Sequence, residues 1–244
     1  MNALGTDRAR RTAGADPTRR TAGQYARATV RRLRMRTLVW LGALSVEAAA
    51  AGRIFGLHDV RFYFAEIALL VSMFVISRFV LPAVDRRDRG ASGEEQVGAL
   101  LDAFCAGDWH VIHDVTLGRG NVDHLVIGPA GVFTIETKSH EGPVRVARVH
   151  GNTLEQARAQ RKSMEAVTGL NAEPLIVYSR AWVDRPLARR KGVRLLPARM
   201  LVRYLQKRPP RLSREQVEAA RLSVAEALVA EHARVARERW YLVR

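Results

Sequence analysis

The sequence contains a single cysteine, Cys105, among 244 residues. One thiol cannot close a disulfide within the chain or supply the several thiolates of a cysteine-based zinc site. We interpret Cys105 as a buried core residue because it follows Phe104 in an apolar stretch. Nine prolines and 18 glycines exclude a collagen-like or low-complexity chain, and a hydrophobic fraction of 48% excludes a disordered one.

Acidic residues are scarce relative to basic ones, 24 against 40, so the net charge is +16. The excess lies at the two ends of the chain. Residues 1–36 carry +8 and residues 171–244 carry +10, whereas residues 37–90 carry +1 and residues 91–170 carry −3. A strongly basic surface suits nucleic acid or anionic lipid, and charge alone does not choose between them.

Two long apolar runs follow the basic arm of residues 1–36, which we expect to be flexible because it lacks apolar periodicity. We expect a hairpin region at residues 37–82 with transmembrane helices over about residues 38–57 and 62–81. Each run has the roughly 20 residues that an α-helix needs to cross the hydrocarbon core of a bilayer. Pro82 is expected to end the second helix.

The basic residues near the two helices predict an orientation. The flanks carry most of them: Arg27, Arg31, Arg32, Arg34 and Arg36 before the first helix, and Arg86, Arg87 and Arg89 after the second. The connecting turn offers Arg61. Because cytoplasmic flanks are enriched in Lys and Arg, we expect a cell-membrane protein with two spanning helices and both termini in the cytoplasm.

Glu47 lies near the middle of the first apolar run. A charged residue at the bilayer centre costs roughly 2.5–3.5 kcal/mol on insertion scales. Glu47 can be protonated, can hydrogen-bond Ser72 of the other helix, or can face a second copy of the hairpin. We favour an assembly contact, which predicts a homo-oligomer, over an intramembrane functional site or a soluble hairpin.

A polar linker at residues 83–93 separates the hairpin from a segment with α/β patterning. We expect a domain over residues 94–208 and a C-terminal helix and tail over residues 209–244. The predicted helices are 94–104, 154–168, 198–206 and 213–236. The predicted strands are 111–117, 123–127, 132–138, 144–149, 174–178 and 193–196. Ser213 and Gln216 have the spacing of a capping box for the last helix.

Two acids and a lysine lie on neighbouring predicted strands. Glu136 and Lys138 project from the same side of one strand because side chains alternate with a period of two. Asp123 opens the adjacent strand and can meet Glu136 across the ladder if the register agrees. Paired carboxylates suit Mg²⁺ or Mn²⁺, and Lys138 beside them could orient a water or stabilise a phosphorane-like transition state.

An E-x-K sequence on a strand is most often a solvated ion pair. Here the acids sit at the ends of apolar strands, where buried charges are costly unless they serve a function. The basic C-terminal part is equally open to two interpretations: a phosphate-binding face, or a solvated surface near anionic lipid. Its residues include Arg189, Arg190, Lys191, Arg194, Arg199, Arg203, Lys207, Arg208 and Arg211.

Four short motifs and a glycine follow one another along this segment: Gly93-Glu94-x-x-Val97, Gly120-Asn-Val-Asp-His124, Gly128-Pro-Ala-Gly-Val-Phe133, Ile135-Glu-Thr-Lys138 and Gly142. Together they resemble the nuclease-related domain (NERD) family over roughly residues 91–206. That family is assigned to the PD-(D/E)xK phosphodiesterase superfamily. The resemblance therefore implies an α/β fold with a restriction-endonuclease-like mixed sheet flanked by helices, preceded here by the transmembrane hairpin.

The resemblance also implies roles for individual residues. Asp123, Glu136 and Lys138 would be the D…ExK signature, and Glu94 would be an additional acid that completes the metal site directly or through water. Gln156 would match the family's glutamine, which positions the substrate backbone or Lys138. Glu95 is the alternative to Glu94. We choose Glu94 because it precedes Val97 and Leu101 on the apolar helix face.

The sequence thus predicts a membrane-anchored, cytoplasm-facing nuclease that hydrolyses phosphodiester bonds with Mg²⁺ or Mn²⁺, with DNA favoured over RNA as partner. One alternative is an inactive module that holds nucleic acid or a protein partner at the membrane. Another is a structural membrane protein whose hairpin drives self-association. Family resemblance predicts fold better than activity, so these alternatives stay open.

Overall fold

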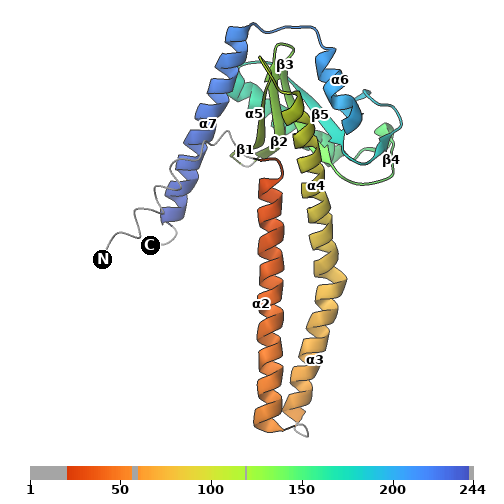
Figure 1. Ribbon diagram of the computed structural model, residues 1–244, viewed down its shortest axis with the longest axis vertical. Coiled ribbons are helices and arrows are strands. Elements are labelled where there is room, and N and C mark those ends of the chain that lie inside the picture. Colours follow the sequence, from red (N-terminus) through yellow and green to blue (C-terminus); the bar gives the residue numbers. More distant parts are fainter. Residues whose placement is uncertain (1–20, 57–59, 119, 242–244) are drawn as a thin grey trace. The chain divides into compact units, whose positions relative to one another are not determined.

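A computed structural model describes the chain over residues 21–56, 60–118 and 120–241 (Figure 1). The chain divides into two compact units, which are treated separately below. One unit is Tyr25–Ala91, and the other is Ser92–Arg244 together with the residues before Tyr25. Of the basic arm expected over residues 1–36, residues 1–20 lie outside the described part.

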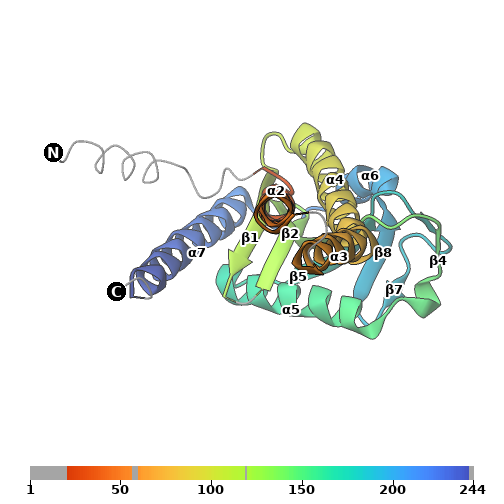
Figure 2. The same ribbon diagram turned by 90° about the horizontal axis from the view of Figure 1, so that it is seen from below.

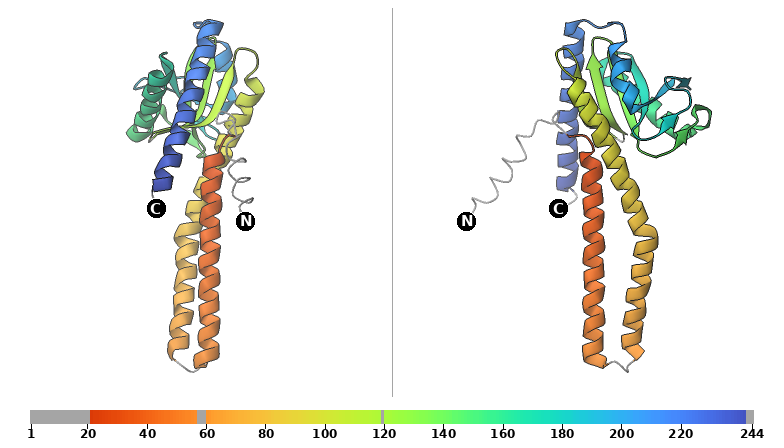
Figure 3. Two further views of the ribbon diagram at one scale, coloured as in Figure 1. Left: turned by 90° about the vertical axis from the view of Figure 1, so that its left-hand side faces the viewer. Right: turned by 45° about the vertical axis from the view of Figure 1, so that its right-hand side comes forward.

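The Tyr25–Ala91 unit consists of long apolar helices that lie side by side (Figure 3). Its helices are α2 (Gln24–Phe55), α3 (Val60–Val75), a π-helical turn (Ile76–Val80) and the first part of α4 (Leu81–Phe104). Two helical stretches, Ala26–Ile54 and Val60–Phe104, are long and apolar enough to cross a membrane by length and composition. Because α2 begins at Gln24, the later part of the expected flexible arm is helical, as its Ala, Leu and Arg content allows.

The linker expected over residues 83–93 is wrong in its secondary structure, because these residues lie inside α4. Pro82 likewise does not end the second apolar helix. A proline removes one N–H and clashes with the carbonyl one turn earlier. The π turn at Ile76–Val80, in which Leu81 N–H bonds Ile76 O, widens the helix just before Pro82 and accommodates it.

Polar contacts in this unit differ between its arginine-rich end and its apolar part. At the basic end, Asp88 of α4 forms ion pairs with Arg27 and Arg34 of α2. Glu47, by contrast, is exposed, and within the described ranges neither Ser72 nor any other side chain bonds its carboxylate. The hydrogen bond to Ser72 considered from the sequence is therefore absent from the described structure.

The Ser92–Arg244 unit is built on a six-stranded mixed sheet, which confirms the predicted α/β fold class. The strand order is β1-β2-β3-β5-β8-β7. The bounds are β1 (His110–Leu117), β2 (Gly120–Gly128), β3 (Gly131–Lys138), β5 (Ala172–Tyr178), β7 (Arg189–Arg190) and β8 (Val193–Pro197). β1, β2 and β3 form an antiparallel meander, β3, β5 and β8 run parallel, and β7 returns antiparallel to β8.

Helices cover both faces of this sheet (Figure 2). On one face lies α5 (Gly151–Thr168), joined by α7 (Arg214–Tyr241), and their buried side chains, such as Met164 and Val224, pack on Leu125. On the other face, the end of α4 and α6 (Leu201–Gln206) pack on a second core. That core includes Val97, Leu101, Phe133, Ile135, Leu201 and Leu205. Strands buried on both faces explain the nearly continuous apolar runs in the sequence.

Three local predictions have mixed outcomes. The capping box of α7 is confirmed: Ser213 N–H donates to Gln216 Oε1 (2.9 Å), and Gln216 N–H donates to Ser213 Oγ (3.3 Å). The strand expected over residues 144–149 is wrong. Only β4 (Pro143–Val144) forms, paired with β6 (Trp182–Val183) in a small separate sheet, and a 3₁₀ turn (Val146–Arg148) follows. The helix expected over 198–206 begins as a 3₁₀ turn (Ala198–Met200) before α6.

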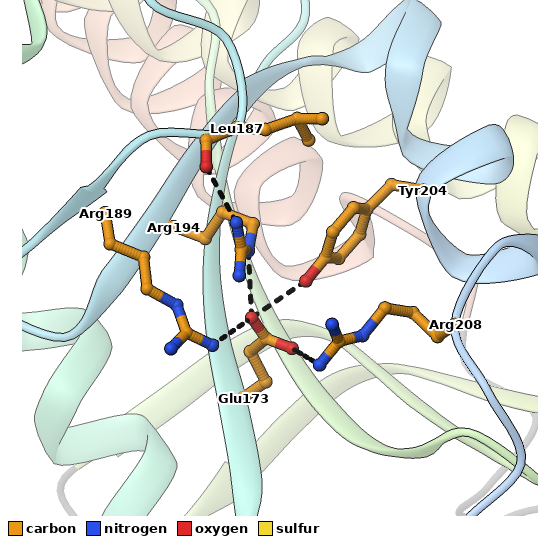
Figure 4. Close-up of polar contacts among 6 residues, drawn as sticks. All are labelled: Glu173, Leu187, Arg189, Arg194, Tyr204 and Arg208. Atoms are coloured by element: carbon orange, nitrogen blue, oxygen red, sulfur yellow. Dashed lines mark hydrogen bonds and ion pairs between the residues drawn. The ribbon is translucent and has the colours of Figure 1, made fainter.

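A partly buried carboxylate, that of Glu173, joins the strands β5, β7 and β8 to α6 (Figure 4). Glu173, at the start of β5, accepts hydrogen bonds on Oε1 from Arg189 (2.8 Å), Arg194 (2.9 Å) and the Tyr204 hydroxyl (2.8 Å). Its Oε2 accepts a bond from Arg208 (3.0 Å). Burial by itself raises the pKa of Glu173, but the bonds from Arg189, Arg194 and Tyr204 outweigh it and lower that pKa to about 2.

This arrangement predicts acid sensitivity. The pKa of Glu173 falls from 4.5 to about 2 on folding, so its contribution to stability is present above pH 4.5 and is lost as the pH falls toward 2. The contribution is on the order of 3 kcal/mol. Urea unfolding of the full-length protein in detergent at pH 7 and pH 3 should show this loss in the wild type and a smaller pH dependence in Glu173→Gln. The same pH dependence in both proteins would contradict the assignment.

Candidate active site

The predicted pairing of Asp123 with Glu136 depends on the register between β2 and β3. His124 pairs with Ile135 in that ladder, so the next positions along the two strands are Asp123 and Glu136, just where the ladder ends. Beyond this point a side chain replaces the backbone as acceptor: Asp123 Oδ2 accepts a hydrogen bond from the backbone N–H of Thr137 (2.7 Å). Both carboxyl groups are buried, with residue exposures of 8% for Asp123 and 4% for Glu136.

The Glu136 carboxylate is held by three side chains. Lys138 Nζ (2.6 Å) and Gln156 Nε2 (2.9 Å) donate to Oε1, and Gln160 Nε2 (2.5 Å) donates to Oε2. Lys138 projects from the same side of β3 as Glu136, as the strand period predicts. Gln156, which the resemblance singled out, contacts Glu136.

Sequence reasoning missed Gln160. It lies four residues after Gln156, which places both amides on one face of α5, and it also donates to the carbonyl of Asn121 (2.7 Å). It is 5% exposed. A second glutamine at helical spacing from Gln156 was the available signal, and Gln160 therefore links β2, β3 and α5 at the site.

Glu94, which the resemblance assigned as an additional acid, lies near the middle of α4. Burial, followed by the charges of Asp114 and Glu136, raises the pKa of Glu94 to about 7. Burial, followed by the charges of Glu136 and Glu94, likewise raises the pKa of Asp123 well above its usual value. The charges of these carboxyl groups thus act on one another, although no hydrogen bond joins Glu94 to Asp123 or Glu136 in the described part of the chain.

Asp114 is a further acid that sequence reasoning missed. It is 2% exposed, and its φ of 51° is in the left-handed region, which Asp adopts more readily than most residues. The β1–β2 ladder pairs His113 with His124 and Val115 with Val122 in one unbroken register, so Asp114 lies opposite Asp123 at a position where the ladder is interrupted. A buried Asp inside the apolar strand 111–117 was the signal in the sequence. Strained residues of this kind cluster at functional sites.

Gly93 allows α4 to approach the loops that follow β3 and β5. A Cβ at this position would lie 2.6 Å from Ser139 Cβ and 2.7 Å from Ser179 Oγ. Gly93→Ala is therefore expected to push α4 and Glu94 away from the site, with a loss of stability of about 1–3 kcal/mol and lower activity. The matched control is Gly90→Ala in the same helix, where a Cβ meets nothing within 4 Å. The control should stabilise by roughly 0.5–1 kcal/mol in thermal unfolding, and equal effects of the two variants would contradict the argument.

The donor chemistry at this site fits a hard divalent cation. Carboxylate oxygens are the ligands Mg²⁺ takes, and a cation would relieve the repulsion that raises the pKa values of Glu94 and Asp123. Across the described ranges, however, no three Asp, Glu, His or Cys side chains are arranged as ligands of one ion. These observations are compatible because Mg²⁺ usually keeps several waters and binds through one or two carboxylates. Asp123 and Glu136 could therefore hold it, with Glu94 nearby.

A basic cavity of about 470 Å³ opens beside Lys138. Its lining is Lys138, His140, Pro143, Val144, Arg145, Arg148, Val149, His150, Thr153 and Tyr178. Among the described residues no acidic side chain belongs to this lining. A concave, positively charged surface beside a cluster of acids and a lysine is suited to a phosphate backbone.

The histidines of this region form a buried pair. His113 Nδ1 and His124 Nδ1 are 2.8 Å apart, and His113 Nε2 is 3.0 Å from Asp102 Oδ1. Burial, followed by the charge of His113, lowers the pKa of His124 to about 3, so His124 is neutral at physiological pH. We interpret the pair as core side chains that pack between β1, β2 and α4.

Comparison with known proteins identifies the segment that holds these residues. Residues 89–180 match the nuclease-related domain family, NERD. The resemblance given by the sequence motifs is therefore confirmed over these residues, which include Glu94, Asp123, Glu136, Lys138 and Gln156.

Two further similarities concern parts of the chain. An uncharacterised protein of Bacillus anthracis is 36% identical over 82 residues, which are 32% of this chain and 38% of that protein. A crystal structure of a repair endonuclease from Pyrococcus abyssi is 15% identical, with a TM-score of 0.28, over 46% of this chain and 42% of that one. The chain thus spans less than half the length of either protein.

Proposed function

We propose that the chain is a membrane-anchored nuclease whose nuclease-related domain hydrolyses phosphodiester bonds in nucleic acid, DNA rather than RNA, with Mg²⁺ or Mn²⁺. The observation that carries this proposal is the pair of contacts at neighbouring positions of β2 and β3: Lys138 bonds Glu136, and Asp123 bonds the backbone N–H of Thr137 between them. The basic cavity beside Lys138 supports a polyanionic substrate. A nuclease-related domain implies nucleic-acid binding in general.

The chemistry follows from where these groups lie. A divalent ion on Asp123 and Glu136 would neutralise charge on the phosphate and lower the pKa of a bound water. Lys138 Nζ, 2.6 Å from Glu136, is placed to hold an attacking water or to stabilise negative charge on the phosphorus oxygens in the transition state. Gln156 and Gln160 fix the Glu136 carboxylate through their amides, and the arginines of the basic cavity orient the substrate strand.

One observation favours a second candidate, an inactive module that binds nucleic acid at the membrane. Both oxygens of Glu136 already accept hydrogen bonds from Lys138, Gln156 and Gln160. A site that has lost its metal would show the same internal pairing. In an active site, at least one of these hydrogen bonds to Glu136 must break so that the carboxylate can bind the ion.

A cleavage assay separates the two candidates. Full-length protein in detergent is incubated with labelled DNA or RNA and with Mg²⁺, Mn²⁺ or a chelator. The proposal predicts metal-dependent cleavage, more of DNA than of RNA, that is lost in Lys138→Met and retained in Lys162→Met, an exposed lysine of α5. Salt-sensitive binding without cleavage under every metal condition would favour the inactive module.

We further propose that α2 and the α3–α4 helix cross the cell membrane with both termini in the cytoplasm. Their length and apolar composition support a membrane anchor, and the arginines of the flanks support the orientation. Lipid would cover the apolar side chains that are exposed along α2 and α3, such as Leu38, Trp40, Phe64 and Leu70. Accessibility of an introduced cysteine at residue 61, compared with one at residue 86, tests the orientation in intact cells.

Glu47 leads to a prediction about assembly. Its exposed carboxylate has no polar partner in the described part of the chain, and at the bilayer centre such a group costs roughly 2.5–3.5 kcal/mol. A second copy of the hairpin would shield it. Glu47→Leu is therefore expected to reduce the oligomer fraction measured by cross-linking in membranes, while Glu66→Leu, nearer a helix end, serves as control. An unchanged oligomer fraction in Glu47→Leu would contradict this interpretation.

A further inference from the structure

We call Glu94, Asp123, Glu136, Lys138 and Gln156 the catalytic group. A second basic cavity lies at the opposite end of β3 from Glu136 and Lys138. It has a volume of about 440 Å³, and its wall includes Gly131 and Val132 at the start of β3 together with Ala172 and Glu173 at the start of β5. Lys138 lies six residues farther along β3 than Val132, so at about 3.3 Å per residue the cavity is roughly 20 Å from the catalytic lysine. No member of the catalytic group belongs to its described lining.

Arginines dominate the charge of this cavity. Four line it: Arg161, Arg189, Arg208 and Arg211. The single acid among the described lining residues is Glu173, which is already bonded by Arg189, Arg194 and Arg208 (Figure 4). Arg161 is paired with Glu165 (3.1 Å). With Arg194 included, five guanidinium groups meet two carboxylates, which leaves a surplus of positive charge at the cavity.

Two of these arginines have unused hydrogen-bonding capacity. The Nε of Arg208 is enclosed and has no acceptor within the described ranges, which is a costly state for a buried donor. Arg211 is exposed, and none of the described carboxylates bonds its guanidinium group. An anion in the cavity would pair with the exposed guanidinium group of Arg211. Guanidinium forks match phosphate oxygens especially well because they can donate two parallel hydrogen bonds.

The remaining wall of the cavity is apolar. Leu170, Pro174 and Leu212 contribute to it, and the volume exceeds what inorganic phosphate alone would fill. Small-molecule sites of this size combine an apolar wall with a few polar groups that fix orientation. We propose that this cavity binds a nucleotide, either free or as part of a nucleic-acid strand, with its phosphate on the arginines and its base against the apolar wall.

Calorimetric titration of the full-length protein with thymidine monophosphate tests this proposal. The titration uses the Glu136→Gln background with chelator, so that the result is independent of cleavage and of metal. We expect binding of the monophosphate but not of thymidine. Arg211→Ala and Arg161→Ala should each weaken it about tenfold, since a hydrogen bond to a charged group is lost. Arg199→Ala, an exposed arginine outside the cavity, should leave it unchanged.

Two further measurements test the charge of the cavity and the source of the nucleotide. Glu173→Gln removes the negative charge of Glu173 from the cavity wall and should tighten binding of the monophosphate several-fold. Partial unfolding of the variant would weaken binding instead. Competition by an oligothymidylate would identify a strand as the source of the nucleotide, and its absence would identify free nucleotide. The proposal is overturned if the monophosphate does not bind. It is also overturned if affinity falls in Arg148→Ala, which alters the basic cavity beside Lys138, and stays constant in Arg211→Ala and Arg161→Ala.

Discussion

Glu136→Gln is expected to reduce metal-dependent cleavage by at least about 10²–10³-fold, the size of effect seen when one group that stabilises transition-state charge is removed. The carboxylate lies at the centre of the site, since Lys138, Gln156 and Gln160 all converge on it. The amide of glutamine is neutral, and its NH₂ group would face these same donors. The variant therefore loses both the negative charge for the cation and the anchor for Lys138.

The matched control for this experiment is Glu141→Gln. Glu141 lies three residues after Lys138, its side chain is 72% exposed, and it forms a surface ion pair with Arg180 (3.4 Å). It should retain cleavage close to wild type, because exposed pairs of this kind contribute little. Rates are compared under saturating Mg²⁺ and with folding checked by circular dichroism. Retained cleavage in a folded Glu136→Gln protein would refute the catalytic role of Glu136.

A divalent cation is expected to stabilise the wild-type domain against heat. At a concentration 100 times its dissociation constant, a ligand that binds the folded state adds about 2.7 kcal/mol, or roughly 5–10 °C in melting temperature for a domain of this size. The expectation follows from the carboxyl groups of Asp123, Glu136 and Glu94, which repel one another in the absence of a cation.

Asp123→Asn should remove this stabilisation by metal and should not lower the stability of the metal-free protein. The asparagine carbonyl can still accept the Thr137 N–H, while the repulsion with Glu136 disappears. Asp108→Asn, an exposed acid that pairs with Arg214 (3.3 Å), is the control and should respond to metal as the wild type does. Differential scanning fluorimetry with and without Mn²⁺ measures both effects. An equal metal shift in Asp123→Asn would contradict the account.

The parts of the fold that depend on local pattern could be predicted from the sequence. The apolar runs predicted the helices of the hairpin unit, and alternating or continuous apolar runs placed β1, β2, β3, β5 and β8 with errors of a few residues at their ends. The boundary between the two units does fall within the expected linker of residues 83–93. The segment is nevertheless helical, because its charged and small residues are compatible with helix and α4 continues through it.

The site could be predicted only in part, for physical reasons. Asp123 and Glu136 follow from the strand period and a register that a short hairpin constrains. The left-handed backbone conformation of Asp114 is known only from the folded strand, and the contact of Gln160 depends on which face of α5 turns toward β3. The arginine cluster around Glu173 brings together residues from β5, β7, β8 and the segment after α6, which are distant in sequence and meet only in the folded structure.

The most direct measurement is the position of Mn²⁺ in crystals of the protein soaked with this ion, located by anomalous diffraction. The account predicts a peak in coordination distance, about 2.0–2.3 Å, of carboxylate oxygens of both Asp123 and Glu136, with Lys138 displaced from at least one oxygen of Glu136. A peak elsewhere, or none at millimolar Mn²⁺ with Lys138 still bound to Glu136, would contradict a shared cation at this site.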